Sequence, residues 1–362
     1  MITMLTEGTM MTLHRAGRVL AVALLLGTMN APAAAGVQES AGPIAISPAP
    51  APSDDGRVFV HGVRRQDEIV VVNVRPLCGG CDPDSLRTAL RVDTYAIHHN
   101  GGNRRWQSSD LESFLAFDAS VATIIYVHGN QLTASDAKCE GLAVYRRLMH
   151  YGADGPPIRF VIFSWPSARV GGLLRDVRVK AGRTDPAGCQ LGWLLDQMPA
   201  ETPVTLVGFS YGARIITGGL HILAGGNLGR LALQERAHPN RAPVNVVLMA
   251  TASHAHWLCE RQYHGLALSQ VNRMLLLNNC RDPAMRFYHL AFRGRRGCPQ
   301  ALGLRGPTCT PRHERSKIQM QDLSRYGSRH SPFLYLCAPS VPGQIWEYAI
   351  EAPGSVQLQA AK

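Results

Sequence analysis

The stretch that decides the fold is VTLVGFSYGARI, residues 204–215. It begins with apolar residues that suit a buried strand, continues through Gly-Phe-Ser-Tyr-Gly, and ends in residues that suit a helix. The central pentapeptide fits G-x-S-x-G, in which a serine occupies a sharp turn between a strand and a helix. That turn requires small residues two positions before and after the serine, and Gly208 and Gly212 meet the requirement. Ser210 is therefore a candidate nucleophile.

Strand-like and helix-like segments alternate on both sides of this turn. Strand-like segments occupy residues 67–77, 90–97, 121–130, 158–167, 204–210, 244–250, 271–279 and 317–324. Helical patterns occur at 137–149, at 188–198 and directly after Ser210. Nearly continuous apolar strands separated by helices are typical of a parallel sheet covered on both faces. The sequence therefore predicts an α/β fold: a doubly wound, mostly parallel sheet with helices on both faces.

The partners of Ser210 are expected where other strands end, because ligands in such sheets bind at the carboxyl ends of the strands. A serine nucleophile needs a histidine base and an acid that orients the base. His330 is the one histidine after the final predicted strand, and Asp282 alone among five acidic residues between Ser210 and His330 directly follows a strongly apolar strand. We predict these three residues as catalytic. For Asp282 a helix N-cap stays open as the alternative, and for His330 a surface loop residue.

Two loops are expected to complete the site. The backbone N–H of Tyr211 is free at the start of the helix, and the loop after an earlier strand supplies a second oxyanion donor, for which Asn130 is predicted. Gln131, the alternative donor, is predicted to contact substrate. Trp165 ends another strand at the same edge and is predicted to wall the substrate cleft, with core packing as the alternative. For His128 a structural role is preferred.

No metal and no cofactor are expected. One strand is followed by three histidines, His254, His256 and His264, but no carboxylate accompanies them closely. Hydrolysis by a serine nucleophile needs no metal. The C-G-G-C stretch at 78–81 has no second ligand pair, which leaves a structural disulfide or plain loop cysteines. The chain has nine cysteines, a number that suits an exported protein with some disulfides and leaves at least one cysteine without an intramolecular partner.

The first residues have the order of an export signal. Arg15 and Arg18 precede an apolar run at 19–26, and small residues follow that end in an A-x-A pattern. We predict a cleaved signal peptide at 1–35, a flexible Pro- and Ala-rich linker at 36–56, and one hydrolase domain at 57–362. The expected location is periplasmic or extracellular. An uncleaved interfacial anchor is the alternative.

The chain of 362 residues carries a formal net charge of +11. The excess is diffuse and includes clusters such as FRGRRG at 292–297, but no basic run is interleaved with aromatic residues. No nucleic-acid partner is therefore expected. The positive balance can favour peripheral contact with an anionic envelope surface, and a basic charge without a specific partner is the preferred alternative.

Taken together, these motifs resemble the α/β-hydrolase superfamily and, within it, the DUF900 group of bacterial α/β hydrolases. The resemblance covers roughly residues 120–335 and rests on YVHGN (126–130), VIFSWPSA (161–168), VGFSYGAR (207–214), LLLNNCRDPAMRF (275–287) and QDLSRYGSRHSPF (321–333). It departs from the group at the elbow, where Phe-Ser-Tyr-Gly stands in place of the usual His-Ser-Met-Gly. The resemblance implies an α/β-hydrolase fold.

The resulting hypothesis is an exported serine hydrolase that cleaves a carboxylic ester, with small-molecule or lipid esters as substrates. Two alternatives stay open. One is a catalytically inactive protein of the same fold that acts in binding or at the envelope. The other is a peptidase or amidase that uses the same triad, because the residues do not separate acyl-oxygen from acyl-nitrogen substrates.

Overall fold

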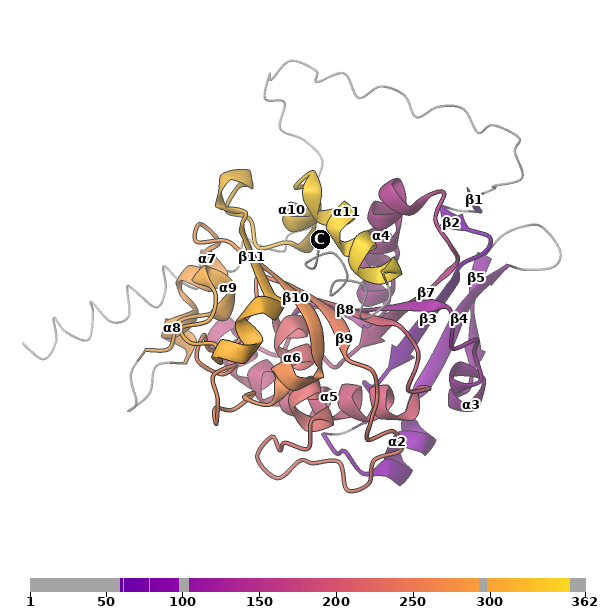
Figure 1. Ribbon diagram of the computed structural model, residues 1–362, viewed down its shortest axis with the longest axis horizontal. Helices are drawn as coiled ribbons and strands as arrows, with labels where there is room; N and C mark the ends of the chain where they lie inside the picture. Colours follow the sequence, from indigo (N-terminus) through magenta and orange to yellow (C-terminus); the bar gives the residue numbers. More distant parts are fainter. Residues whose placement is uncertain (1–58, 61, 78, 98–103, 293–297, 352–362) are drawn as a thin grey trace, which may run out of the picture.

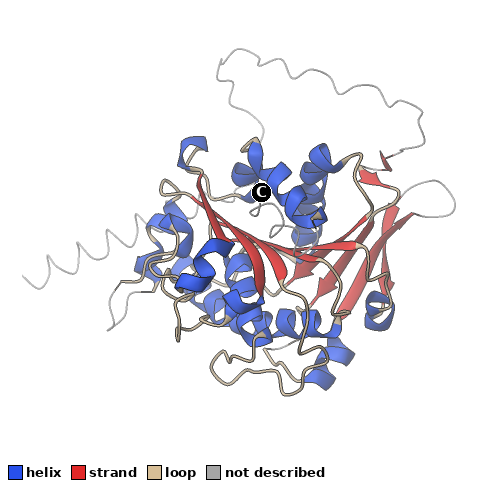
Figure 2. Cartoon of the chain, in the orientation of Figure 1, coloured by secondary structure: helices blue, strands red, loops and turns tan. Residues whose placement is uncertain are grey.

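The computed structural model describes residues 59–60, 62–77, 79–97, 104–292 and 298–351. The predicted signal peptide and linker lie outside these residues. A twisted nine-stranded sheet crosses the molecule and carries helices on both faces (Figures 1 and 2). The predicted fold class, an α/β-hydrolase fold with a mostly parallel sheet, is confirmed.

The sheet has the strand order β11-β10-β9-β8-β6-β7-β3-β4-β5. The bounds are β3 Glu68–Asn73, β4 Arg91–Ile97, β5 Arg104–Ser109, β6 Ala122–Val127, β7 Ile158–Ser164, β8 Val204–Phe209, β9 Val244–Met249, β10 Val271–Asn278 and β11 Ile318–Asp322. All pairs from β11 to β3 are parallel, and β4 and β5 add an antiparallel edge. The central strands β7, β8 and β9 are buried along their whole length, which explains why they read as unbroken apolar runs.

Two helix layers cover the sheet. The helices α4 (Ala134–Gly152), α10 (Pro332–Leu336) and α11 (Ser340–Ile350) lie on one face, and α5 (Leu173–Gln197) and α6 (Tyr211–Leu223) lie on the other (Figure 1). The helices α5 and α6 pack so closely that a β-carbon at Gly219 would lie 2.9 Å from the carbonyl oxygen of Gly188. This packing fixes the helix that follows Ser210.

The remaining elements are short. They are β1 (Phe59–Val60), β2 (Val63–Arg64), α2 (Pro83–Ala89), α3 (Leu111–Leu115), α7 (Pro283–Arg286), α8 (Tyr288–Ala291), α9 (Leu302–Arg305), η2 (Ala267–Gln270), η3 (Arg312–Lys317) and η4 (Ser324–Tyr326). The predicted helix at 188–198 is only the final part of α5, which begins at Leu173 and contains Pro186. Sequence 173–187 has no clean apolar stripe, because α5 buries a charged pair, Asp176 and Lys180, on its inner side.

Two disulfides connect distant segments, Cys81–Cys189 and Cys259–Cys309. Cys81 belongs to the C-G-G-C stretch, but its partner lies on α5, so the disulfide ties the loop before α2 to the helix layer. Cys78 lies outside the described residues. Among the helices that the structure describes, none is both long enough and apolar enough to cross a bilayer.

Candidate active site

Ser210 occupies the turn between β8 and α6 in a strained conformation, with φ 54° and ψ −115°. This conformation is energetically unfavourable for a non-glycine residue, so surrounding contacts must stabilise it. The Ser210 N–H donates to the carbonyl of Met249 at 2.9 Å, and the N–H of Ala252 donates to the carbonyl of Ser210 at 3.1 Å. A β-carbon at Gly212 would collide with the carbonyl oxygen of Val127. The sequence requirement for glycine at this position therefore has a steric cause.

A chain of hydrogen bonds runs from Ser210 through His330 to Asp282. His330 Nε2 lies 3.0 Å from Ser210 Oγ, and His330 Nδ1 lies 2.7 Å from Asp282 Oδ2. The carboxylate accepts from Nδ1–H, which leaves Nε2 free to accept the serine proton. The structure thus brings together the three residues predicted as catalytic. Only 17% of the His330 side chain is exposed, which argues against an ordinary surface loop histidine.

Asp282 both caps a helix and bonds to His330, the two kinds of contact that the alternatives from the sequence require. It precedes Pro283 as the N-cap of α7, and its Oδ1 accepts from the N–H of Ala284 at 2.9 Å. Its Oδ2 accepts from His330, and the hydroxyl of Tyr335 donates to the same oxygen at 3.2 Å. The side chain is fully buried, so these donors replace the water that a carboxylate needs. Tyr335 was not predicted, because nothing in the sequence marks a tyrosine five residues after His330.

The backbone N–H groups of Tyr211 and Asn130 are available to an oxyanion. Tyr211 is the first residue of α6, and no hydrogen bond among the described residues uses either N–H. The N–H of Gln131 instead donates to the carbonyl of Ser167 at 2.9 Å, which leaves Asn130 as the better donor of the two. Tyr211, Asn130 and Gln131 all line the cavity above Ser210.

The Asn130 loop is anchored by a buried acid that the sequence analysis missed. Asn130 Nδ2 donates to Asp176 Oδ2 at 2.8 Å, and Lys180 Nζ lies 3.0 Å from Asp176 Oδ1. Although burial by itself would raise the pKa of Asp176, hydrogen bonds from Val170, Lys180 and Asn130 lower it. Asp176 therefore stays charged and holds the loop. No motif marks it, since its role depends on the folded contact between α5 and the loop.

His128 has a structural role beneath the same loop. It is fully buried, and burial lowers its pKa to about 3, so the imidazole is neutral. Its Nδ1 lies 2.8 Å from the carbonyl oxygen of Gly129, so Nδ1 carries the proton, while Nε2 accepts from the N–H of Trp165 at 3.3 Å. The Gly129 carbonyl and the Asn130 N–H belong to one peptide unit. His128 therefore helps to fix the direction of that N–H.

The prediction that Trp165 walls the substrate cleft is wrong. Its side chain is fully buried, and it is not among the described residues that line the cavity at Ser210. The indole N–H donates to the carbonyl of His128 at 2.9 Å, and the ring stacks on the imidazole with 5.8 Å between centroids. Trp165 thus supports the oxyanion loop from below, in line with the core alternative.

The cavity at Ser210 has a volume of about 170 Å³ and two sides. On the side of α5 and α8 it is lined by Leu173, Leu174, Val177, Leu290, Ala291 and Phe292. On the side of α4 and α10 it is lined by Leu132, Glu140, Ser331 and Pro332. Most of the wall is therefore apolar, with the polar groups of the candidate triad and the oxyanion loop between the two sides.

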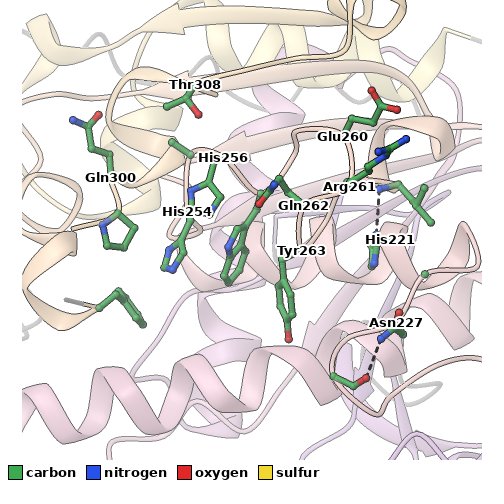
Figure 3. Close-up of a pocket in the computed structure, with 18 of the residues that line it drawn as sticks. His221, Asn227, His254, His256, Glu260, Arg261, Gln262, Tyr263, Gln300 and Thr308 are labelled. Carbon is green, nitrogen blue, oxygen red and sulfur yellow. Dashed lines mark hydrogen bonds between the residues drawn. The ribbon is translucent and has the colours of Figure 1, made fainter. Parts of the chain in front are cut away.

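A larger cavity, of about 1290 Å³, lies away from Ser210. Figure 3 shows His254, His256, Tyr263 and Gln300 around it. In the described part of the chain, no group of three or more His, Cys, Asp or Glu residues could hold a metal ion. Phe292 is the described residue that lines both this cavity and the one at Ser210.

The sheet order, the strained serine after β8 and the acid after β10 define an α/β-hydrolase fold. No protein-family model and no curated protein matches the chain, so the resemblance to the DUF900 group stays a prediction. Among solved structures, it is similar to two inhibitor complexes of esterase B from Lactobacillus rhamnosis. Identities are 13% and 14%, with TM-scores of 0.31 and 0.28. Each alignment covers 82% of this chain, and 86% and 85% of the respective esterase chains. This likeness is too weak to carry an argument, and the fold assignment rests on the topology.

Proposed function

We propose that this protein is a serine hydrolase that cleaves small carboxylic esters through an acyl-enzyme. The observation that carries the proposal is the continuous hydrogen-bond chain from Ser210 Oγ to His330 and on to Asp282. Ser210 is hydrogen-bonded to His330, and His330 is hydrogen-bonded to Asp282. This is the geometry that activates a serine. The N–H groups of Tyr211 and Asn130, which no hydrogen bond among the described residues uses, add the donors that a developing oxyanion requires.

In the proposed reaction, His330 Nε2 removes the proton from Ser210 as Oγ attacks the ester carbonyl. The Tyr211 and Asn130 N–H groups stabilise the oxygen that becomes negative. The imidazolium then gives its proton to the leaving alcohol, and the acyl group stays on Ser210. A water molecule that His330 activates in the same way releases the carboxylic acid and restores the serine.

The size of the cavity supports a small ester. Pockets that enclose drug-sized ligands have volumes of roughly 300 to 1,000 Å³. The cavity at Ser210 measures about 170 Å³, and its lining is mainly apolar. A short acyl chain and a small alcohol fit that space, whereas a long lipid chain would extend beyond it.

The test is hydrolysis of p-nitrophenyl butyrate together with covalent labelling by a fluorophosphonate. We expect Ser210→Ala to lose the label and to lose about 10⁶-fold in kcat, the scale known for triad knockouts. Ser328→Ala is the matched control, because it removes an exposed serine close in sequence to His330. Equal labelling of wild type and Ser210→Ala, or no turnover by wild type, would favour a catalytically inactive binding protein.

We also propose that the protein is exported. The basic, apolar and small-residue order of the N-terminus supports this, as do the disulfides Cys81–Cys189 and Cys259–Cys309, since disulfides persist in oxidising compartments. Expression of the full chain in a bacterial host, followed by fractionation and N-terminal mass measurement, tests the proposal. Retention of an intact N-terminus in the cytoplasmic fraction would contradict it.

A further inference from the structure

The lining of the cavity at Ser210 contains one acidic side chain among its described residues, Glu140. Glu140 lies on α4, and α4 packs against α10, which begins two residues after His330. Glu140 therefore shares its side of the cavity with Ser331 and Pro332. Since His330 protonates the leaving alcohol in the proposed reaction, this is the side on which the alcohol part of an ester would lie.

The two oxygens of Glu140 differ in their surroundings. Oε1 accepts a hydrogen bond of 2.8 Å from the hydroxyl of Tyr126, a fully buried residue of β6. Oε2 accepts no hydrogen bond within the described part of the chain, and it is not closed off from solvent. One oxygen is thus bonded to the protein interior, and the other is accessible on a residue that lines the cavity.

In the described part of the chain, no Lys or Arg forms an ion pair with the carboxyl group of Glu140. The pKa of Glu140 is raised to about 7, chiefly by burial; the bond from Tyr126 lowers it in part, and the nearby charge of Asp136 raises it. No Lys or Arg is among the described residues that line the cavity. A partly buried acceptor without a protein partner gains stability when a ligand donates a hydrogen bond to it.

We propose that Oε2 of Glu140 is the recognition point for a hydrogen-bond donor on the alcohol part of the substrate. The substrate class is then a small ester whose alcohol carries a hydroxyl or a protonated amine. The inference rests on the proposed esterase function and adds to it. It assigns Glu140 a role in substrate specificity that is separate from the catalytic steps.

Two matched pairs of esters test the proposal. The first pair is 2-hydroxyethyl butyrate and propyl butyrate. The second is 2-(dimethylamino)ethyl butyrate, which carries a protonated amine near neutral pH, and 3-methylbutyl butyrate, which has the same shape without the donor. We expect wild type to prefer the donor-bearing member of at least one pair by about tenfold or more in kcat/KM, the scale of a hydrogen bond to a charged group. The pair that shows the preference distinguishes hydroxyl from amine.

Variants separate recognition from structure. Glu140→Leu should bring the preference ratio close to one, and Glu140→Gln should reduce the amine preference more than the hydroxyl preference, because the amide accepts without a charge. Tyr126→Phe is the control: it removes the structural bond to Oε1 and should keep the ratio. If Glu140 had a purely structural role, Glu140→Leu would lower kcat/KM equally for both esters of a pair and leave their ratio unchanged.

Equal kcat/KM within both pairs for wild type, or an unchanged preference in Glu140→Leu, would overturn the inference while leaving the esterase function intact. If wild type hydrolyses none of the four esters and is not labelled by the fluorophosphonate, the proposed function fails and the inference fails with it.

Discussion

Phe292, the described residue that lines both cavities, leads to a prediction about acyl chain length. Phe292 lines both the cavity at Ser210 and the larger one, and its ring packs on Tyr288 and His254 with centroid distances of 4.5 and 5.6 Å. It lies on the α5 and α8 side, opposite Glu140, where the acyl chain of an ester would extend. Phe292→Ala should therefore open the end of the acyl site into the larger space.

The magnitude follows from the volumes. A cavity of about 170 Å³ holds a short acyl chain, so further methylene groups gain little in wild type. With the wall removed, the cavity of about 1290 Å³ becomes accessible. Each added methylene that leaves water contributes about 0.8 kcal/mol, equivalent to about a fourfold increase in kcat/KM. Between butyrate and octanoate, four methylenes, the variant should gain up to roughly 200-fold relative to wild type.

The assay is kcat/KM for p-nitrophenyl esters from butyrate to dodecanoate. We expect wild type to favour the shortest chains and Phe292→Ala to shift its optimum to longer ones. Leu290→Ala is the matched control, because Leu290 lines the cavity at Ser210 but not the larger one. Leu290→Ala frees only the space of one side chain, so the preferred acyl chain should lengthen by no more than that space allows. If Phe292→Ala folds, keeps its fluorophosphonate label and shows the wild-type chain-length profile, Phe292 does not limit the acyl site.

Two further predictions concern stability. The pKa of His128 is about 3 in the folded protein and about 6.5 in the unfolded chain. Below pH 6.5 the unfolded chain therefore binds a proton that the folded protein excludes. As the pH falls from 6.5 to 3, this histidine should lower the free energy of unfolding by about 1.4 kcal/mol per pH unit. His128→Asn should reduce the difference in urea unfolding free energy between pH 7.5 and 4.5 by about 2 to 3 kcal/mol, and an unaltered difference would refute this. Separately, Cys81–Cys189 joins residues 108 positions apart, so replacing both by alanine should cost about 4 to 5 kcal/mol in urea unfolding, whereas a loss below about 1 kcal/mol would contradict it.

The fold could be predicted from the sequence because burial leaves a direct mark on composition. The central strands β7, β8 and β9 have both faces covered, so they cannot tolerate polar residues and read as apolar runs. Ser210, Asp282 and His330 could be selected because few residues of the right type follow strands at the same edge of the sheet. Scarcity of alternatives, more than any motif, identified Asp282 and His330.

Other features depended on contacts that only the folded chain creates. The first half of α5 has an irregular pattern, since the charges of Asp176 and Lys180 neutralise each other inside the protein. Trp165 ends a strand at the correct edge, yet its ring turns into the core beside His128, and sequence position does not determine that direction. Glu140 lies four residues before Val144 and therefore on the buried side of α4, yet an acidic residue on an amphipathic helix normally faces solvent, so the pattern does not assign it to a cavity.

The loop that carries Asn130 is held from both sides before any substrate is present. The Gly129 carbonyl accepts from His128, and the Asn130 side chain donates to Asp176. The partners His128 and Asp176 are not among the described residues that line the cavity, so an oxyanion would meet an N–H that is already fixed, with no reorganisation to offset its stabilising effect. Substrate binding energy is then not needed to order this part of the site. In the proposed esterase, discrimination between esters would therefore fall to the two ends of the cavity, where we expect Phe292 to limit the acyl chain and Glu140 to recognise the alcohol.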